Sequence, residues 1–138
     1  MSEAFELDPR LESDTLAVDE LELNAVRLMN DSAYPWLVLV PMRPGLKDFH
    51  DLSAEDLPVM AREMVQASRV LERLHRPDRV NVAALGSQVA QLHVHVIARF
   101  EADPAWPGPV WGVQPHRPYP QAELEDALAA LRGGFVEF

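Results

Sequence analysis

Apolar and polar positions alternate in short runs along the first part of the chain, and these runs predict β-strands. Thr15 to Leu23 and Ala25 to Met29 read as two short strands that break near Asn24. The continuous apolar run from Trp36 to Pro41 is long enough for a buried strand and too short for a helix. Three strands are therefore expected before the first long helix.

A long amphipathic helix is expected after these strands. Ser53 begins it, with Asp56 three positions later as a capping-box partner, and Pro77 stops it. Apolar residues from Leu57 to Leu74 recur at helical spacing, which predicts about five to six turns with one apolar face. The other positions of this helix include the charged residues Arg62, Glu63, Arg69, Glu72 and Arg73.

Two further strands complete the predicted sheet. Arg79 to Leu85 and Gln91 to Phe100 read as an antiparallel pair joined by a short loop at Gly86 to Val89. The pattern predicts a single α+β domain over residues 1–138. We expect an antiparallel sheet of about five strands that carries the long helix and a C-terminal helix.

The remaining segments have their own signatures. Residues 1–14 are polar and predict an arm or a short helical turn. Residues 103–120 hold six prolines and two tryptophans, so this segment cannot be regular and should pack against the rest of the domain. The C-terminal helix is expected within residues 121–134, from Ala122 to Arg132, with Gly133-Gly134 as its cap.

The fifth predicted strand carries two histidines two positions apart in an apolar run. Because side chains of a strand alternate between faces, Gln91, His93 and His95 should share one face while Leu92 and Val94 face the core. A neutral imidazole can attack phosphorus, pass a proton or bind a metal at ordinary pH. The pair therefore indicates a reactive face on a rigid element.

Two other interpretations of the pair remain open. Both histidines could be surface residues of a solvated strand face, or they could share one metal ion. Against a metal site, no cysteine is present and no further ligand follows at a recognisable spacing. The other histidines, His50, His75 and His116, are scattered singly.

Composition narrows the class of partner. Twelve basic against 22 acidic residues give a formal charge of −10, which repels nucleic-acid polymers. The absence of cysteine excludes a disulfide framework and a thiolate nucleophile. No leader segment and no apolar run near the roughly 20 residues of a membrane span are visible. We expect a soluble, cytoplasmic protein without a membrane partner.

The strand from Gln91 to Arg99 resembles the signature of the histidine triad (HIT) superfamily, in which three histidines alternate with apolar residues on a strand. Three further stretches fall in the order that the family has: Val40 to Pro44, Asp48 to Leu52 and Gly86 to Val89. The resemblance covers roughly residues 20–112. It departs from the family at one position, because Gln91 stands where the first histidine is found.

The resemblance implies a role for each member of the altered triad. His93 matches the middle histidine, the nucleophile that attacks the α-phosphate of a nucleotide. His95 matches the third histidine, which contacts the phosphate region. Gln91 should support His93 by hydrogen bonding, since an amide can accept or donate but cannot titrate.

The resemblance also implies a set of nucleotide-binding residues. Gly86, Ser87 and Gln88 would meet the charge on the phosphate through backbone N–H groups and side chains. Asn81 matches an asparagine near the phosphates, and Asn30 a ribose-binding position. As alternatives, Asn30 could simply form a turn and Asn81 could cap a strand end.

Residues beyond the triad have two interpretations as well. Arg99 could balance phosphate charge or form a surface salt bridge. Trp106 and Trp111 resemble a tryptophan-proline tail that family members lay near the active site or across a dimer. They could also simply cover the exposed face of the sheet.

The leading functional prediction is a nucleotide hydrolase or nucleotidyl transferase that works through a covalent nucleotidyl-histidine, with no cofactor and no obligatory metal. The alternative is a non-catalytic nucleotide-binding HIT module. The resemblance and the apolar, tryptophan-bearing surface also predict a homodimer, with most of its interface from residues 53–75 and the hairpin strands.

Overall fold

The computed structural model describes residues 4–113 and 116–136, and it confirms the predicted α+β domain. Residues 1–3 of the expected arm and residues 114–115 of the proline-rich segment lie outside this range. One antiparallel sheet has the strand order β1-β2-β3-β5-β4. The strands are β1 (Thr15–Glu20), β2 (Asn24–Met29), β3 (Trp36–Pro41), β4 (Arg79–Ala84) and β5 (Val94–Arg99).

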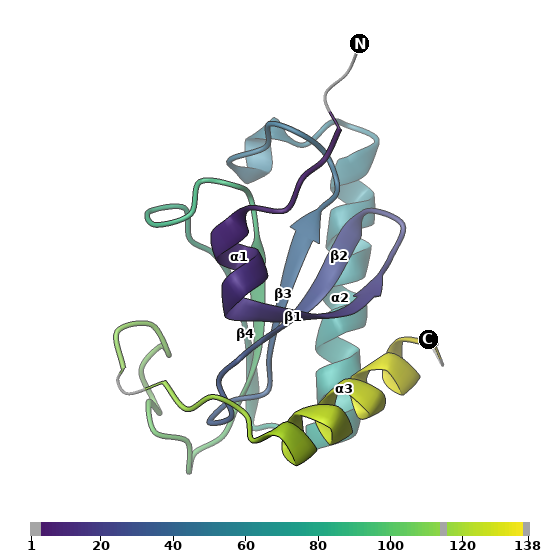
Figure 1. Cartoon of the computed structure of the whole chain (residues 1–138). Coiled ribbons are helices and arrows are strands. Elements are labelled where there is room, and N and C mark those ends of the chain that lie inside the picture. Colours follow the sequence, from purple (N-terminus) through teal and green to yellow (C-terminus); the bar gives the residue numbers. More distant parts are fainter. Residues whose placement is uncertain (1–3, 114–115, 137–138) are drawn as a thin grey trace.

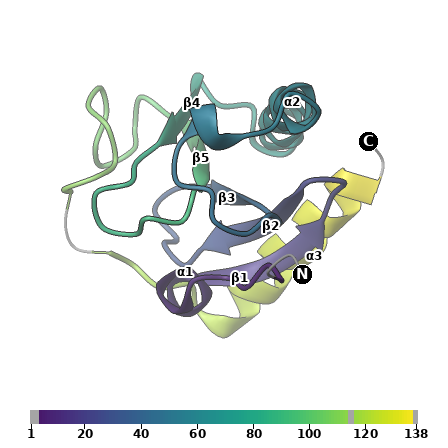
Figure 2. The same ribbon diagram turned by 90° about the horizontal axis from the view of Figure 1, so that it is seen from above.

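Helices and irregular segments cover both faces of this sheet (Figures 1 and 2). The helices are α1 (Pro9–Asp14), α2 (Asp56–His75) and α3 (Gln121–Val136), with a short 3-10 turn, η1 (Phe49–Asp51). No helix in the described part of the chain is both long and apolar enough to cross a membrane.

The buried side chains form two clusters, one on each face of the sheet. On the first face, α2 and α3 pack against residues that include Leu37, Leu39 and Val96. On the second face, Leu11 of α1 and Val110 of the proline-rich segment pack with Trp36, Val38 and Ile97. Because β3 alternates between the clusters and is buried on both sides, it reads in the sequence as one continuous apolar run.

Helix α2 is one amphipathic helix, as predicted, but one of its charged residues faces inward. The helix begins at Asp56, so the prediction that Ser53 begins it is wrong, and the Asp56 carboxylate binds Arg43 and forms no capping box. The Asp56 N–H still donates to Ser53 Oγ at 3.1 Å. Glu63 is buried, and its carboxylate accepts hydrogen bonds from the backbone N–H groups of Leu23 and Asn24. This glutamate therefore satisfies backbone N–H groups at the turn between β1 and β2. Leu57, which was expected on the apolar face, is half-exposed.

Strand β5 is shorter than predicted at its start. The prediction that Gln91 and His93 lie within the strand is wrong, because the ladders to β3 and β4 both begin at Val94. His93 nevertheless stays beside His95, with ring centroids 5.0 Å apart. The alternative that both histidines are surface residues of a solvated strand face is wrong, since both are buried.

Helix α3 runs through Gly133 and Gly134, so the prediction that these glycines cap the helix is wrong. A Cβ atom at Gly134 would lie 2.9 Å from Cγ1 of Val70, a fully buried residue of α2. A Cβ atom at Gly133 would meet nothing within 4 Å. Gly134 therefore permits the close approach of α3 to α2, while Gly133 has no such contact.

Alanine at the two glycines should have opposite effects on stability. Gly133→Ala is expected to raise the free energy of unfolding by about 0.5–1 kcal/mol, because alanine loses less backbone entropy in a helix. Gly134→Ala should lower it by about 1 kcal/mol or more, since the new methyl group overpacks against Val70. Urea unfolding of both variants checks this. Equal stabilisation by both would contradict the close approach described above.

Candidate functional site

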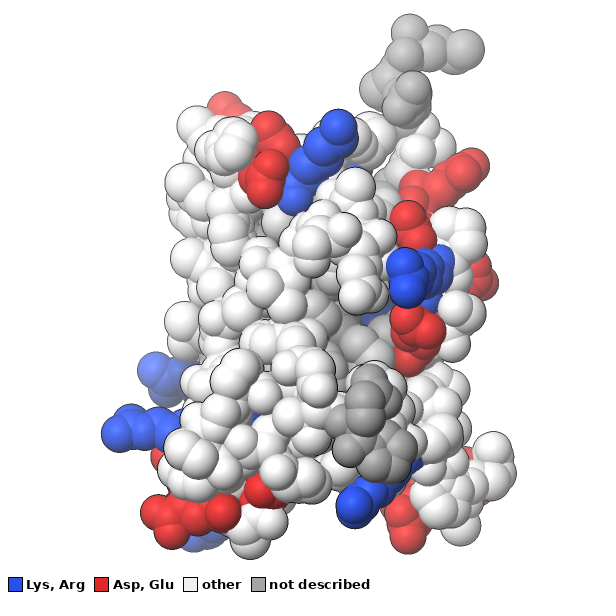
Figure 3. Space-filling view, turned by 90° about the vertical axis from the view of Figure 1, so that its left-hand side faces the viewer, with Lys and Arg blue, Asp and Glu red and all other residues white. Residues whose placement is uncertain are grey.

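A cavity of about 660 Å³ opens on the second face of the sheet, a volume within the range of small-ligand sites. It lies between α1, the loop before the signature histidines and the part of the proline- and tryptophan-rich segment around Trp111. Figure 1 shows these three parts on the same side of the sheet. The middle of this face carries few charged side chains, which gather at its edges (Figure 3). Its lining includes Arg10, Asp14, Asn30, Trp36, Ser87, Gln88, His93, His95, Trp111 and His116.

The protonation of His93 follows from its partner. Its Nδ1 atom lies 2.7 Å from the backbone carbonyl oxygen of Gln91. A carbonyl oxygen can only accept, so Nδ1 must carry the proton. The lone pair of the neutral ring therefore resides on Nε2, which is the form that a nitrogen nucleophile needs.

His95 has the opposite tautomer. The indole N–H of Trp36 donates to Nδ1 of His95 at 2.9 Å, so this nitrogen must be unprotonated and the ring proton lies on Nε2. Burial, and after it the neighbouring His93, lowers the pKa of His95 to about 4. His95 is thus a neutral ring that offers an N–H donor beside the lone pair of His93.

The side chain of Gln91 does not hold His93, contrary to the sequence-based expectation. Its Oε1 accepts from the backbone N–H of Asp8 at 2.9 Å, and its Nε2 donates to the carbonyl of Glu6 at 2.8 Å. The main chain of Gln91, not its amide, bonds the nucleophile candidate. The amide instead ties the N-terminal arm to the edge of the cavity.

The other predicted nucleotide-binding residues divide into two groups. Ser87, Gln88 and Asn30 line the cavity together with the histidines. Gly86 is exposed and outside this lining. Asn81 is also outside it, and its Oδ1 accepts a hydrogen bond from Arg99 Nη1 at 2.7 Å.

Arg99 is not a surface residue but half of a buried ion pair. Its guanidinium binds both carboxylate oxygens of Asp103, at 2.8 and 3.0 Å, and the carbonyl of Gly108 at 2.7 Å. Burial alone would raise the pKa of Asp103, but hydrogen bonds from Arg99 and from the backbone of Phe100 and Trp106 hold it below its usual value.

This ion pair organises the proline- and tryptophan-rich segment, which packs against the sheet as predicted. Trp111 stands edge-on to both Trp36 and His95, at centroid distances of 6.2 and 5.2 Å. Val110, the preceding residue, is buried in the second core cluster. The segment therefore forms one wall of the cavity and shields His95 from water.

Two groups of cavity residues were not predicted from the sequence. Trp36, which sets the tautomer of His95, was assigned only to the core, because an indole in a buried strand carries no local sign of a polar role. Arg10 and Asp14 of α1 were placed in an arm of no assigned function. The glutamine at position 91 was the one available signal, since it breaks the histidine pattern where the arm attaches.

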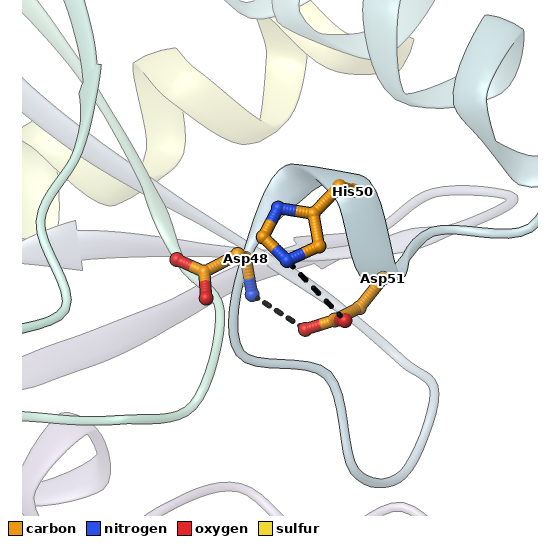
Figure 4. Close-up of side chains that lie close together, drawn as sticks. All are labelled: Asp48, His50 and Asp51. Atoms are coloured by element: carbon orange, nitrogen blue, oxygen red, sulfur yellow. Dashed lines mark hydrogen bonds and ion pairs between the residues drawn. The ribbon is translucent and has the colours of Figure 1, made fainter.

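Among the residues that the structure describes, one set of three side chains could supply ligand atoms to a metal ion: Asp48, His50 and Asp51, in and beside η1. All three are exposed. Figure 4 shows the side chains of His50 and Asp51 on the turn, with Asp48 beside them. The carboxylate of Asp51 already accepts backbone N–H groups of Lys47 and Asp48, and these bonds lower its pKa. These contacts account for the set as the cap of a turn.

The sheet, the buried imidazole pair and the cavity beside it define a histidine triad fold. The HIT domain family matches residues 10–102, so this chain belongs to that family. No curated protein gave a match.

Solved structures extend this likeness over nearly the whole chain. A histidine triad protein from Bradyrhizobium japonicum is 40% identical with a TM-score of 0.94, and the match covers 96% of this chain and 99% of that one. A histidine triad protein from Marinobacter aquaeolei VT8 is also 40% identical, with a TM-score of 0.94 and 98% coverage of both chains. One from Sinorhizobium meliloti 1021 is 42% identical, with a TM-score of 0.91 and coverage of 94% and 96%.

The two tautomers can be tested directly by nitrogen–proton correlation NMR of the imidazole rings. At neutral pH, His93 should show the Nδ1–H form and His95 the Nε2–H form, because their partners are a carbonyl and an indole N–H. His95 should remain neutral from about pH 8 down to about pH 5, since its pKa lies near 4. Titration of His95 near pH 6.5 would contradict this account.

Proposed function

We propose that this protein is a nucleotide hydrolase or nucleotidyl transferase that acts on the α-phosphate of a nucleoside phosphate conjugate through His93. The observation that carries the proposal is the opposite tautomers of His93 and His95 in one cavity. An unprotonated Nε2 of His93 can attack phosphorus. The N–H of His95 beside it can donate to a phosphoryl oxygen, on which charge develops.

The reaction has two displacements in this proposal. In the first, Nε2 of His93 bonds to the α-phosphorus and the bond to the leaving group breaks. In the second, water or another acceptor attacks the same phosphorus and frees His93. The burial of both rings favours these steps, because donors in a site shielded from water interact more strongly with phosphoryl charge.

Three residues around the histidines would bind the rest of the nucleotide. Ser87 and Gln88 line the cavity and can donate to phosphate oxygens. The carbonyl oxygen of the Asn30 side chain accepts from the backbone N–H of Tyr119, which leaves its NH₂ group to donate to ribose hydroxyls. Gly86 and Asn81 were assigned by resemblance alone, and the cavity lining does not support a direct role for either.

In this proposal Gln91 occupies the position of the first triad histidine without loss of the nucleophile. The bond to Nδ1 of His93 comes from the main-chain carbonyl of residue 91, which is present whatever side chain stands there. A glutamine can therefore replace a histidine at this position while His93 keeps its tautomer. The substitution does not by itself favour the alternative, a non-catalytic nucleotide-binding module.

The ligand is a small molecule rather than a nucleic-acid polymer. A formal charge of −10 opposes the binding of a polyanion. The cavity of about 660 Å³ suits a single nucleotide conjugate. Membership of the HIT family supports a nucleotide as this ligand.

Removal of the nucleophile tests the proposal. A panel of adenosine phosphate conjugates with different leaving groups and a label on the α-phosphate should leave label on the protein. His93→Ala should abolish both labelling and turnover, because no other group in the reaction can form the intermediate. His75→Ala, at the exposed end of α2, serves as the matched control and should keep both.

Circular dichroism and urea unfolding establish that the His93→Ala variant folds. Turnover retained by this variant would contradict the assignment of His93. Nucleotide binding by the parent protein without labelling or turnover would instead establish the non-catalytic module.

We also propose that the protein is a homodimer that pairs through α2 and the edge strand β4. A shallow hollow of about 580 Å³ lies between these two elements. Apolar residues are exposed there in the single chain: Val65 of α2 is 50% exposed and Val82 of β4 is 40% exposed. An apolar surface beside a free strand edge favours association with a second copy.

A charged residue in this surface should separate the subunits. The parent protein is expected to sediment as a dimer at micromolar concentration, and Val65→Arg as a monomer, because an arginine there would be buried without a partner. Val136→Arg is the control, since Val136 is an exposed apolar residue of α3 that does not line this hollow. A parent protein that sediments as a monomer would refute the dimer.

A further inference from the structure

The N-terminal arm forms a wall of the cavity, and its attachment is built from several contacts. Phe5 and Leu7 pack against the second core cluster, and Leu11 of α1 is buried in it. Apolar packing of this kind holds the arm on the domain but does not fix its position along the cavity rim, because such contacts are non-directional.

Hydrogen bonds fix the position of the arm along the cavity rim. The side-chain amide of Gln91 is bonded at both ends, to the carbonyl of Glu6 and the N–H of Asp8. Asp8 in turn caps α1, since its carboxylate accepts the backbone N–H of Arg10 at 2.8 Å. A continuous chain of bonds therefore runs from the residue beside the histidines to the first turn of α1.

The guanidinium of Arg10 reaches the cavity from this turn. Its Nη2 atom lies 3.4 Å from Oε1 of Gln88, on the loop that we propose to contact phosphate. Within the described lining of the cavity, Arg10 is the one lysine or arginine, and Asp14 is the one carboxylate. A guanidinium stays protonated at any physiological pH, so Arg10 supplies a permanent positive charge to this site.

An anionic substrate needs such a charge in this protein. The formal charge of −10 produces a field that repels phosphate, and a local cation at the mouth of the cavity offsets this repulsion. A guanidinium also presents several N–H donors in a planar fork that matches the oxygens of a phosphate. Its present partner, a neutral amide at 3.4 Å, is weak and easily exchanged for an anion.

We propose that Arg10 is the anion-binding residue of the nucleotide site and that Gln91 is the positioning residue that holds it there through Glu6 and Asp8. This inference rests on the proposed nucleotide site. The glutamine in the triad position thus has its own task, which is to fix the arm and not to assist His93.

Binding of adenosine 5′-monophosphate and of adenosine, each measured by NMR titration, tests the role of Arg10. Arg10→Gln should weaken binding of the monophosphate by about tenfold or more, the effect of losing a charged hydrogen bond, and leave adenosine binding unchanged. Arg10→Lys should restore part of the loss. Arg62→Gln removes an exposed arginine paired with Glu22 outside the cavity and should have no effect on either ligand.

The role of Gln91 has a separate readout. Gln91→Leu keeps the approximate size of the side chain but removes both bonds, so the amide of Asp8 should exchange its hydrogen faster with solvent. Binding of the monophosphate should weaken as well. In combination with Arg10→Gln the losses should be less than additive, because both changes remove the same contact.

Each failure has a distinct meaning. If the parent binds neither ligand, the proposed nucleotide site is wrong and this inference is overturned with it. If Arg10→Gln binds the monophosphate as Arg62→Gln does, or loses both ligands equally, Arg10 does not bind the anion while the proposed function stands. Unchanged exchange at Asp8 and unchanged binding in Gln91→Leu would overturn the positioning role.

Discussion

The buried ion pair between Arg99 and Asp103 is the interaction on which the cavity depends. It joins the end of β5 to the irregular segment after it, and both side chains are at most 3% exposed. Loss of one partner would leave a buried charge unpaired, which costs about 3–5 kcal/mol. The segment held by this pair brings Trp111 against His95. A contact at the end of β5 thus determines the surroundings of His95, which lies near the start of the same strand.

The chemical states of the two imidazoles are set by groups that do not titrate near neutral pH. A main-chain carbonyl fixes the proton of His93, and the indole of Trp36 fixes that of His95. The carbonyl belongs to Gln91, two residues before His93 in the chain. The indole is in place because of strand pairing: Val38 of β3 lies opposite His95, and Trp36 lies opposite Ile97 on the same ladder. The tautomer of His95 therefore depends on the register of β3 against β5 as well as on the residues themselves.

Local patterns in the sequence were sufficient for the elements, and tertiary contacts explain what they missed. The run from Trp36 to Pro41 is a strand because both of its faces are buried, which a continuous apolar run signals. Gly134 has the local signature of a helix cap, yet its small size serves the contact with Val70. Likewise, nothing near Arg10 in the sequence indicates the cavity, because its partners are about 80 residues away.

The attachment of the arm has a consequence for the order in which the molecule assembles. The two bonds of the Gln91 amide join residues separated by 83 and 85 positions along the chain. Contacts of such separation form late, since the entropy of closing a long loop must be offset by structure already present. The hairpins β1-β2 and β2-β3 can pair early, but the arm can dock only after residue 91 is in place. The cavity is then a late product of folding, completed after the sheet that supports it.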